Sequence, residues 1–196
     1  MESPAIRPSS MRDTSDIPFS LISSSFTEAA APVKTLFLIC FLSITCLLNA
    51  ADKPVIQIHT DNSSLIFRIA DNGRLYQSYL GKKLSHETDI SHLPHGTEAY
   101  ITHGMEDYFE PAIHILHNDG NPSLLLKYVS HETKAVSQGV NETIITLGDD
   151  KYPVTVKLHY VTYPAEDIIK TYTEISHKEK KPVVLHQYAS SMLHLN

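Results

Sequence analysis

Adjacent acidic residues occur in the 196-residue chain at Glu106-Asp107, Asp149-Asp150 and Glu166-Asp167. Two carboxyl groups placed on either side of a bond can act as general acid and as nucleophile or base. Neighbouring residues on a strand, however, point to opposite faces, and acidic residues in turns are solvated. Surface charge is therefore the better interpretation of each pair, and no catalytic residue is predicted among them.

Histidine occurs twelve times and offers two spacings that resemble metal-binding patterns, His92-x-x-His95 and His114-x-x-His117. Three-residue spacing brings two side chains to one face of a helix but to opposite faces of a strand, and the second pair lies in a predicted strand. His92 and His95 lie in a predicted loop and could converge, but no third ligand is evident. Polar strand and loop histidines are the better interpretation, so no metal site is predicted.

Ser190-Ser191, flanked by His186 and His194, superficially resembles a nucleophile and its base. No glycine stands nearby to form a nucleophile elbow or an oxyanion loop.

The chain has only seven glycines and no phosphate-binding glycine pattern, so no cofactor is predicted. The net charge of -6 leaves no basic footprint, which argues against nucleic acid as a partner.

Short apolar segments separated by turns fill the chain from Val55 onward, with the two-residue period of β-strands and no helical period. Asp71-Asn72-Gly73 is the strongest hairpin signal, because Asn-Gly accepts positive φ. The region 85–108 is irregular. The predicted strands are Val55–His59, Ser64–Ala70, Leu75–Leu80, Ile113–His117, Leu124–Glu132, Asn141–Leu147, Val154–Thr162, Ile168–His177 and Val183–Leu195. This spacing predicts an all-β, antiparallel sandwich.

The segment 33–50 has the form of a secretory signal peptide. Lys34 precedes an apolar core, Leu36–Leu48, that is too short to span a bilayer comfortably. The small residues Ala50 and Ala51 follow, which suits cleavage near them. We therefore expect export to the periplasm or the medium and no stable membrane span. A signal anchor is the competing interpretation, and a lipoprotein signal ending at Cys46 is the weaker one.

Residues 1–32 are rich in Ser and Pro and lack any periodicity, which is typical of a disordered leader. Signal peptides normally begin within a few residues of the start of the chain. One hypothesis is that translation begins at Val33 from a non-ATG codon and that 1–32 is wrongly assigned to the protein.

Both cysteines, Cys40 and Cys46, lie in the apolar run, so no disulfide framework is predicted.

Several segments carry a family resemblance through their order and spacing. They are Glu110–Asn121, Leu126–His131, Tyr152–Val154, Glu174–His177 and Tyr188–Leu193. Together they resemble the amino-terminal domain of glycoside hydrolase family 36 α-galactosidases. The resemblance covers about Val55 to Leu195 and assigns 51–196 to this domain.

The resemblance implies a β-supersandwich that precedes a (β/α)₈ catalytic barrel. In the family, the nucleophile and the acid/base lie in the barrel, in motifs that contain Trp, Asp, Cys and Gly. This chain has no Trp and no cysteine after residue 46, so no catalytic residue can be carried over. The expectation is an incomplete sandwich domain or gene fragment that is inactive alone. The full-length enzyme would hydrolyse α-galactoside oligosaccharides. The resemblance is also compatible with a homo-oligomer.

The loop before Glu110 is the one region where the sequence suggests ligand contact. His103, Asp107, Tyr108 and Phe109 combine aromatic faces with a carboxylate, which suits a sugar's C–H faces and hydroxyl groups. These residues are predicted to line the rim of a substrate site. An ordinary structured loop packed on the sandwich is the competing interpretation.

The sequence is also compatible with a function of another class, namely a stand-alone carbohydrate-binding or structural β-sandwich in the periplasm.

The strand predicted at Val183–Leu195 is apolar and has no later strand to cover it. An unpaired apolar edge promotes aggregation, so the isolated chain is expected to be poorly soluble or molten.

Overall fold

A computed structural model describes residues 53–104 and 109–195 of the chain. The chain divides into two units, Met1–Ala50 and Ala51–Asn196, and the description concerns the second. The predicted leader and signal peptide therefore lie outside the described residues. Within the described part, no helix is long and apolar enough to cross a membrane.

The first sheet contains β1 (Val55–His59), β2 (Ser63–Ile69), β3 (Leu75–Lys82) and β4 (Thr97–Glu98), in that order and antiparallel. The predicted turn between β2 and β3 is confirmed. Gly73 has a φ of 81°, which a glycine adopts without strain. The hairpin follows from this turn and from the alternating apolar residues on either side.

The second sheet contains β6 (Leu126–Ser137), β7 (Val140–Asp149), β8 (Val154–Tyr163) and β9 (Ile168–His177), again in sequence order and antiparallel. The predicted alternation on β8 is confirmed, because Val154, Val156, Leu158 and Tyr160 are buried in the core. A strand whose side chains are apolar on one face only must pack that face against another layer of the protein.

A third, two-stranded sheet pairs β5 (Ile113–Leu116) with β10 (Val184–Tyr188). The strand predicted at Val183–Leu195 is therefore too long. It ends at Tyr188, and Ala189 and Met192 beyond it pack against the core as non-strand residues. Along one edge the segment pairs with β5, which is an earlier strand.

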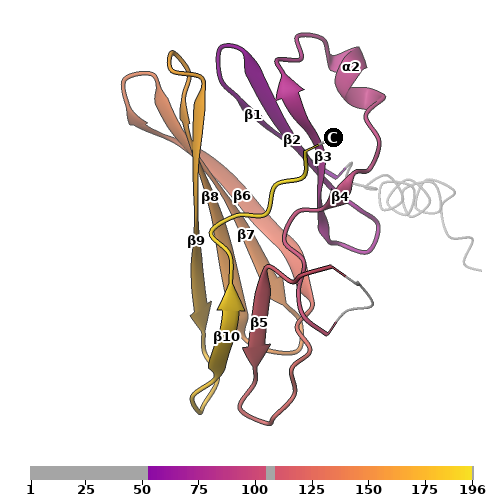
Figure 1. Cartoon of the computed structure of the whole chain (residues 1–196), viewed down its shortest axis with the longest axis vertical. Helices are drawn as coiled ribbons and strands as arrows, with labels where there is room; N and C mark the ends of the chain where they lie inside the picture. Colours follow the sequence, from indigo (N-terminus) through magenta and orange to yellow (C-terminus); the bar gives the residue numbers. More distant parts are fainter. Residues whose placement is uncertain (1–52, 105–108, 196) are drawn as a thin grey trace, which may run out of the picture. The chain divides into compact units, whose positions relative to one another are not determined.

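Figure 1 shows β6 to β9 facing β1 to β4, with β5 and β10 side by side. Buried residues of all three sheets form one apolar cluster, including Phe67, Ile113 and Ile145. The Phe67 ring lies 5.2 Å from the Tyr160 ring across the two larger sheets. Each such side chain, fully buried, contributes roughly 1.5–3 kcal/mol, so this cluster is the main source of stability.

The irregular region before Glu110 contains a short helix that the sequence did not predict. It is α2 (Glu87–Ser91), and β4 follows it. A helix of five residues is little more than one turn, too short to show a 3.6-residue period. The guanidinium of Arg68 donates a hydrogen bond to the carbonyl of Ile90, which attaches the helix to β2.

Candidate functional site

The structure describes two of the four predicted rim residues. Asp107 and Tyr108 lie outside the described residues, whereas His103 and Phe109 stand on either side of them. The His103 ring stacks on His114 of β5, with 3.8 Å between ring centroids. Phe109 is 66% exposed and lines a surface hollow. The two described residues therefore belong to different local environments.

The hollow at Phe109 has a volume of about 260 Å³. It is also lined by Arg74, Tyr76, Gly96, Thr97, Glu98 and Ile101. Arg74 donates from Nε to Oε1 of Glu98 at 2.9 Å, and Nη2 pairs with the second oxygen. Two aromatic side chains beside a planar ion pair offer stacking and hydrogen-bonding groups together. That combination suits a polyhydroxylated ligand such as a sugar.

Gly96 allows this hollow to form by bringing β4 close to β3. Its φ is 79°, and a Cβ atom at this position would lie 1.8 Å from the carbonyl oxygen of Gln77. Any other residue would push β4 away from β3. Gly96 therefore fixes the place of Glu98 opposite Arg74.

Three histidines from separate segments lie in a row on β5 and its neighbours. His114 stands between His103 and His186, whose ring centroid is 4.8 Å from its own. Burial, with the neighbouring imidazoles, lowers the pKa of His114. Imidazole lone pairs lie in the ring plane, so stacked rings do not converge on one ion. Among the described residues, no group of His, Cys, Asp and Glu could hold a metal.

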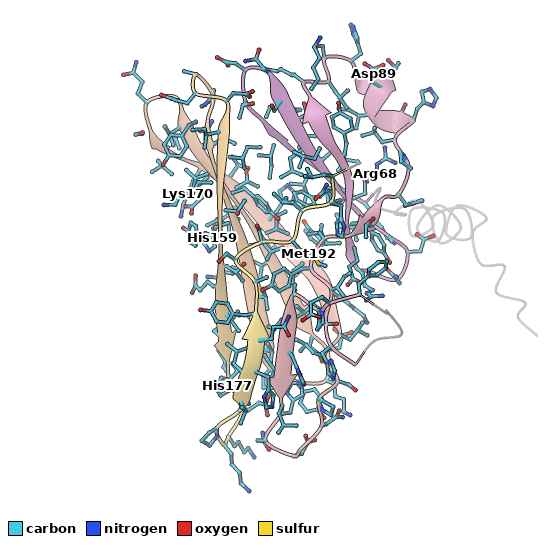
Figure 2. All side chains as sticks on the ribbon, in the orientation of Figure 1. Arg68, Asp89, His159, Lys170, His177 and Met192 are labelled. Atoms are coloured by element: carbon cyan, nitrogen blue, oxygen red, sulfur yellow. The ribbon has the colours of Figure 1, made fainter. Side chains whose placement is uncertain are left out.

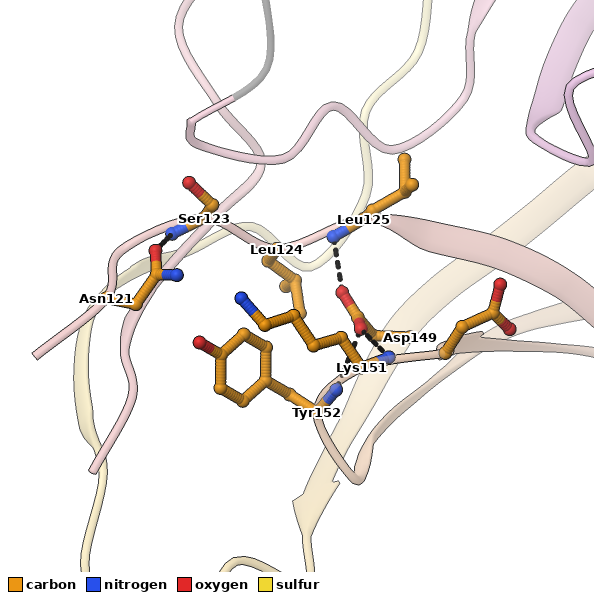
Figure 3. A pocket seen from close by; sticks show the side chains of 8 residues that line it. Asn121, Ser123, Leu124, Leu125, Asp149, Lys151 and Tyr152 are labelled. Carbon is orange, nitrogen blue, oxygen red and sulfur yellow. Dashed lines mark hydrogen bonds between the residues drawn. The ribbon is translucent and has the colours of Figure 1, made fainter. Parts of the chain in front are cut away.

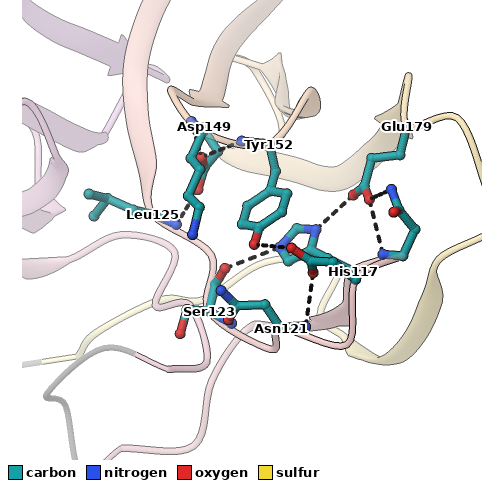
Figure 4. Close-up of polar contacts among 10 residues, drawn as sticks. His117, Asn121, Ser123, Leu125, Asp149, Tyr152 and Glu179 are labelled. Atoms are coloured by element: carbon teal, nitrogen blue, oxygen red, sulfur yellow. Dashed lines mark hydrogen bonds and ion pairs between the residues drawn. The ribbon is translucent and has the colours of Figure 1, made fainter.

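His117 forms a buried polar network that ties three segments together (Figure 4). Its Nδ1 lies 2.7 Å from Oε1 of Glu179, and Nε2 lies 3.1 Å from the carbonyl oxygen of Ser123. The His117 ring stacks on Tyr152 at 3.6 Å and 7°. Asn118 donates its backbone N–H to the other oxygen of Glu179 at 3.1 Å. Both ring nitrogens of His117 therefore have an oxygen partner within the network.

Glu179 stays ionised in spite of its burial. Its side chain is only 2% exposed, and burial alone would raise its pKa. The hydrogen bonds from His117 and Asn118 outweigh burial, so the pKa of Glu179 is lowered. With His117 and Asn118 bonded to its two oxygens, Glu179 serves as an anchor for the loop between β9 and β10.

The acidic pair Asp149-Asp150 lies beside a small apolar pocket of about 170 Å³ (Figure 3). The Asp149 carboxylate accepts three backbone N–H groups, from Leu125 at 2.6 Å, Lys151 at 2.6 Å and Tyr152 at 2.9 Å. These bonds hold the β7–β8 turn against the start of β6. Asp149 thus has a structural role in this turn.

Asp167 of the third acidic pair also fixes a turn. It has a φ of 55°, which is uncommon for a residue other than glycine. Its carboxylate accepts hydrogen bonds from the hydroxyl groups of Thr60 and Ser63. The bond from Thr60 is the main cause of a lowered pKa for Asp167. The β8–β9 turn is in this way joined to the β1–β2 turn.

A second histidine–glutamate cluster lies on the outer face of β6 to β9, where the sequence gave no signal. Nδ1 of His159 is 2.9 Å from Oε1 of Glu142, and the His159 ring stacks on Tyr172 at 4.2 Å. The Tyr172 hydroxyl and the Lys134 ammonium also bind Glu142. The Tyr172 hydrogen bond is the main reason that the pKa of Glu142 is lowered to about 2. Only the register of four strands brings these residues together.

Comparison with protein families now identifies the fold. Residues 72–196 match the glycosyl hydrolase family 36 N-terminal domain. The chain belongs to this family. The match covers β3 to β10 and includes the buried network around His117. The resemblance stated from the sequence is thereby confirmed, as is the all-β fold that it implies.

Solved family 36 structures share this fold. The α-galactosidase of Lactobacillus brevis aligns with a TM-score of 0.60 at 17% identity, over 71% of this chain and 23% of its own. The galactosidase domain of the α-galactosidase–sucrose kinase AgaSK aligns with a TM-score of 0.63 at 19% identity, over 70% of this chain and 24% of its own.

A variant of the α-galactosidase AgaA from Geobacillus stearothermophilus, in complex with raffinose, gives a TM-score of 0.63 at 18% identity, over 70% of this chain and 24% of its own. The family 36 chain therefore spans about a quarter of these solved proteins. A search of curated proteins found no match. The two acidic pairs that the structure places, Asp149-Asp150 and Glu166-Asp167, lie at turns, and the expectation of a non-catalytic domain fits this arrangement.

Proposed function

We propose that this family 36 domain is the amino-terminal scaffold of an α-galactosidase. The whole enzyme would remove terminal α-galactosyl residues from oligosaccharides with retention, through a covalent galactosyl-enzyme intermediate. The observation that carries the proposal is the family match over residues 72–196. The similarity to about a quarter of several α-galactosidases supports it.

The coding sequence downstream of Asn196 tests this proposal. We expect it to encode a (β/α)₈ barrel, in frame or after a frameshift. The longer product, expressed with the frame restored, should hydrolyse a chromogenic α-galactoside. A downstream sequence without a barrel would contradict the proposal and leave a stand-alone carbohydrate-binding or structural sandwich.

Within such an enzyme, we propose that the loop from His103 to Phe109 lies at the rim of the substrate site. Asp107 and Tyr108 belong to the same loop. Support comes from the hollow in which Phe109 lies beside Tyr76 and the Arg74–Glu98 pair. Sugars stack on aromatic side chains and hydrogen-bond to charged groups, so this hollow would contact the distal part of an oligosaccharide.

Replacing Phe109 by Ala in the full-length enzyme tests the rim. We expect KM for a raffinose-type substrate to rise several-fold while kcat stays within twofold, because lost binding far from the cleaved bond affects both states equally. Tyr188→Ala is the matched control, since Tyr188 is 64% exposed and lies on β10. Equal KM values for wild type and F109A would remove the rim role.

For localisation we propose export directed by the segment 33–50, followed by removal of that segment. The support is the sequence pattern of Lys34 and the apolar run. Cell fractionation with N-terminal sequencing of the mature chain tests this. A new N-terminus near Ala51 in the exported fraction is expected, and an unprocessed cytoplasmic chain would contradict export.

A further inference from the structure

Two hollows meet at Tyr76 of β3. The hollow that contains Phe109, which we call the rim hollow, is lined in part by Tyr76. A second hollow lies beside the β2–β3 turn and has a volume of about 410 Å³; we call it the turn hollow. It is lined by the same tyrosine and by Ala70, Asp71, Asn72 and His95. Because one side chain belongs to both linings, the hollows adjoin and Tyr76 stands at their boundary.

Strand register places Tyr76 in a row of outward-facing side chains. Arg68 of β2 and Glu98 of β4 are its direct cross-strand partners, and such partners share one face of a sheet. The neighbouring Leu75 points the other way, into the core. Figure 2 labels Arg68 on the side of β2 that faces away from β6 to β9. Both hollows therefore open on the face that does not pack on the core.

The Tyr76 side chain is held by the turn that precedes it. The amide nitrogen of Asn72 donates a hydrogen bond to the Tyr76 hydroxyl group at 3.3 Å. The amide oxygen of Asn72 accepts one from the backbone N–H of Arg74 at 2.9 Å. A side chain that is already fixed loses little conformational entropy when a ligand binds to it. Tyr76 is therefore a preformed aromatic platform between the two hollows.

The charged groups along both hollows are paired with opposite charges. At the turn hollow, Lys53 donates to a carboxylate oxygen of Asp71 at 3.0 Å. At the rim hollow, Arg74 pairs with Glu98. Among the described residues that line the hollows, neither sign of charge is therefore in excess. Such a surface has no strong field with which to attract an ionic ligand, so it favours an uncharged one.

The polar side chains of the turn hollow are complementary to a sugar. The amide of Asn72 and the imidazole of His95 carry donors and acceptors, and the carboxylate of Asp71 accepts. Sugar hydroxyl groups both donate and accept, and the C–H faces of a sugar ring pack on aromatic side chains. Tyr76 supplies an aromatic surface to both hollows. The same combination of groups thus occurs twice, with one aromatic ring in common.

The size of the hollows favours a ligand that occupies both. Sites for small molecules generally measure about 300–1,000 Å³. The rim hollow, at about 260 Å³, lies below this range, and the turn hollow, at about 410 Å³, lies near its lower end. A ligand confined to one hollow makes few contacts, whereas a ligand that crosses Tyr76 uses the lining of both.

We propose that the two hollows form one carbohydrate-binding groove, in which consecutive units of a neutral oligosaccharide occupy the rim hollow and the turn hollow. One unit contacts Phe109, and the next contacts Asp71 and His95. Tyr76 touches both units and contributes most to binding. The inference extends the proposed rim from one hollow to two, and its choice of ligand rests on that proposal. Binding itself needs no catalytic barrel.

Titration of the full 196-residue chain with raffinose and with galactose, followed by NMR chemical shifts, tests the groove. Raffinose is a trisaccharide and is long enough to cross Tyr76, whereas the monosaccharide galactose fills one hollow at a time. Linking the units makes the second contact intramolecular, so we expect raffinose to bind roughly tenfold or more tightly than galactose.

Tyr76→Leu should weaken raffinose binding roughly tenfold or more, because it removes the ring that both units contact. Asp71→Ala and Phe109→Ala should each weaken it several-fold, since each removes contacts to one unit. Tyr128→Leu is the matched control. It makes the same change at another half-buried tyrosine, on β6, that lines neither hollow, and it should bind raffinose like wild type.

Circular dichroism shows whether each variant is folded. Asp71→Ala keeps the test decisive if Tyr76→Leu does not fold, because the Asp71 side chain is fully exposed. Equal affinities for raffinose and galactose, or no binding of raffinose, would overturn the groove. Unchanged raffinose affinity in both Y76L and D71A would overturn it equally. A barrel encoded downstream of Asn196 alters none of these results, so the groove and the α-galactosidase proposal fail separately.

Discussion

Two histidine–glutamate–tyrosine clusters of the same composition lie in different parts of this domain. His117, Glu179 and Tyr152 form the first, and His159, Glu142 and Tyr172 form the second. The first joins segments 62 residues apart, and both of its imidazole nitrogens face acceptors. In the second, Nε2 of His159 has no hydrogen-bond partner among the described residues.

The difference shows how position decides what a polar cluster does. The Glu179 side chain is 2% exposed, so the first cluster is inaccessible to solvent and serves only to connect segments. The second cluster lies on the outer face, where Tyr172 is partly exposed and Glu174 of the β9 edge approaches His159. We therefore expect the first cluster to contribute more to folding stability than the second.

The largest effect should come from Glu179→Ala. It leaves the buried Nδ1 of His117 without its partner and removes the bonds to Asn118, and together these losses should cost about 3–5 kcal/mol. Glu142→Ala should cost less, about 1–2 kcal/mol, because Tyr172 and Lys134, which bind Glu142, are themselves partly exposed and can bond to water instead. Urea unfolding measures both, with the exposed Glu166→Ala as control. A larger loss for E142A than for E179A would contradict the comparison.

A pH dependence on the order of 1–3 kcal/mol should come from Glu142. Its pKa is about 2 in the folded state, against an ordinary value of 4.5. The unfolded chain binds more protons between these values, so the stabilisation is complete above pH 4.5 and is lost as the pH falls toward 2. Unfolding free energies of wild type and Glu142→Gln should converge over this range. A constant difference would contradict the assignment.

The tyrosine hydroxyl groups should have smaller effects. Tyr152 donates to Asp119 at 2.9 Å, and Tyr172 donates to Glu142. Tyr→Phe removes one hydrogen bond and keeps the ring stacked on its histidine, so each change should cost about 1 kcal/mol. Y172F should also raise the pKa of Glu142, since that hydrogen bond is the main cause of its lowering. An acid titration of stability that is identical in Y172F and wild type would contradict this.

The smallest effect should come from His114. Burial and the neighbouring His103 and His186 lower the pKa of His114. The unfolded state then takes up the proton more readily, so stability is complete above the ordinary value of 6.5 and declines as the pH falls below it. Thermal unfolding of wild type and His114→Leu between neutral and mildly acidic pH measures this. If the difference in Tm between the two proteins does not change with pH, His114 is not a source of the pH dependence of stability.

Local patterns predicted most of the strands. The alternation in Ile168–His177 predicts β9 with its observed bounds, and Asn72-Gly73 predicts the turn between β2 and β3. Both predictions succeed because both signals depend only on neighbouring residues. The pairing of β5 with β10 depends on residues about 70 positions apart, and no local period encodes it. The short helix α2 was missed for the opposite reason, since it is too brief to have a period.

The polar clusters were harder to predict than the strands. His117 was interpreted as an ordinary strand or loop histidine, and its burial against Glu179 depends on a loop that is distant in sequence. His159 and Tyr172 face each other across β8 and β9 only in the observed register. Of the predicted rim residues, Phe109 lines a hollow together with residues of β3 and β4.

The most direct test of the scaffold role is turnover of a chromogenic α-galactoside by the purified 196-residue chain. Glycoside hydrolysis needs two carboxyl groups on either side of the bond, and the carboxylates of Asp149, Asp167 and Glu179 are engaged in holding turns and loops. We predict release of chromophore no faster than in buffer, at any protein concentration. Hydrolysis that scales with the amount of chain would contradict the account.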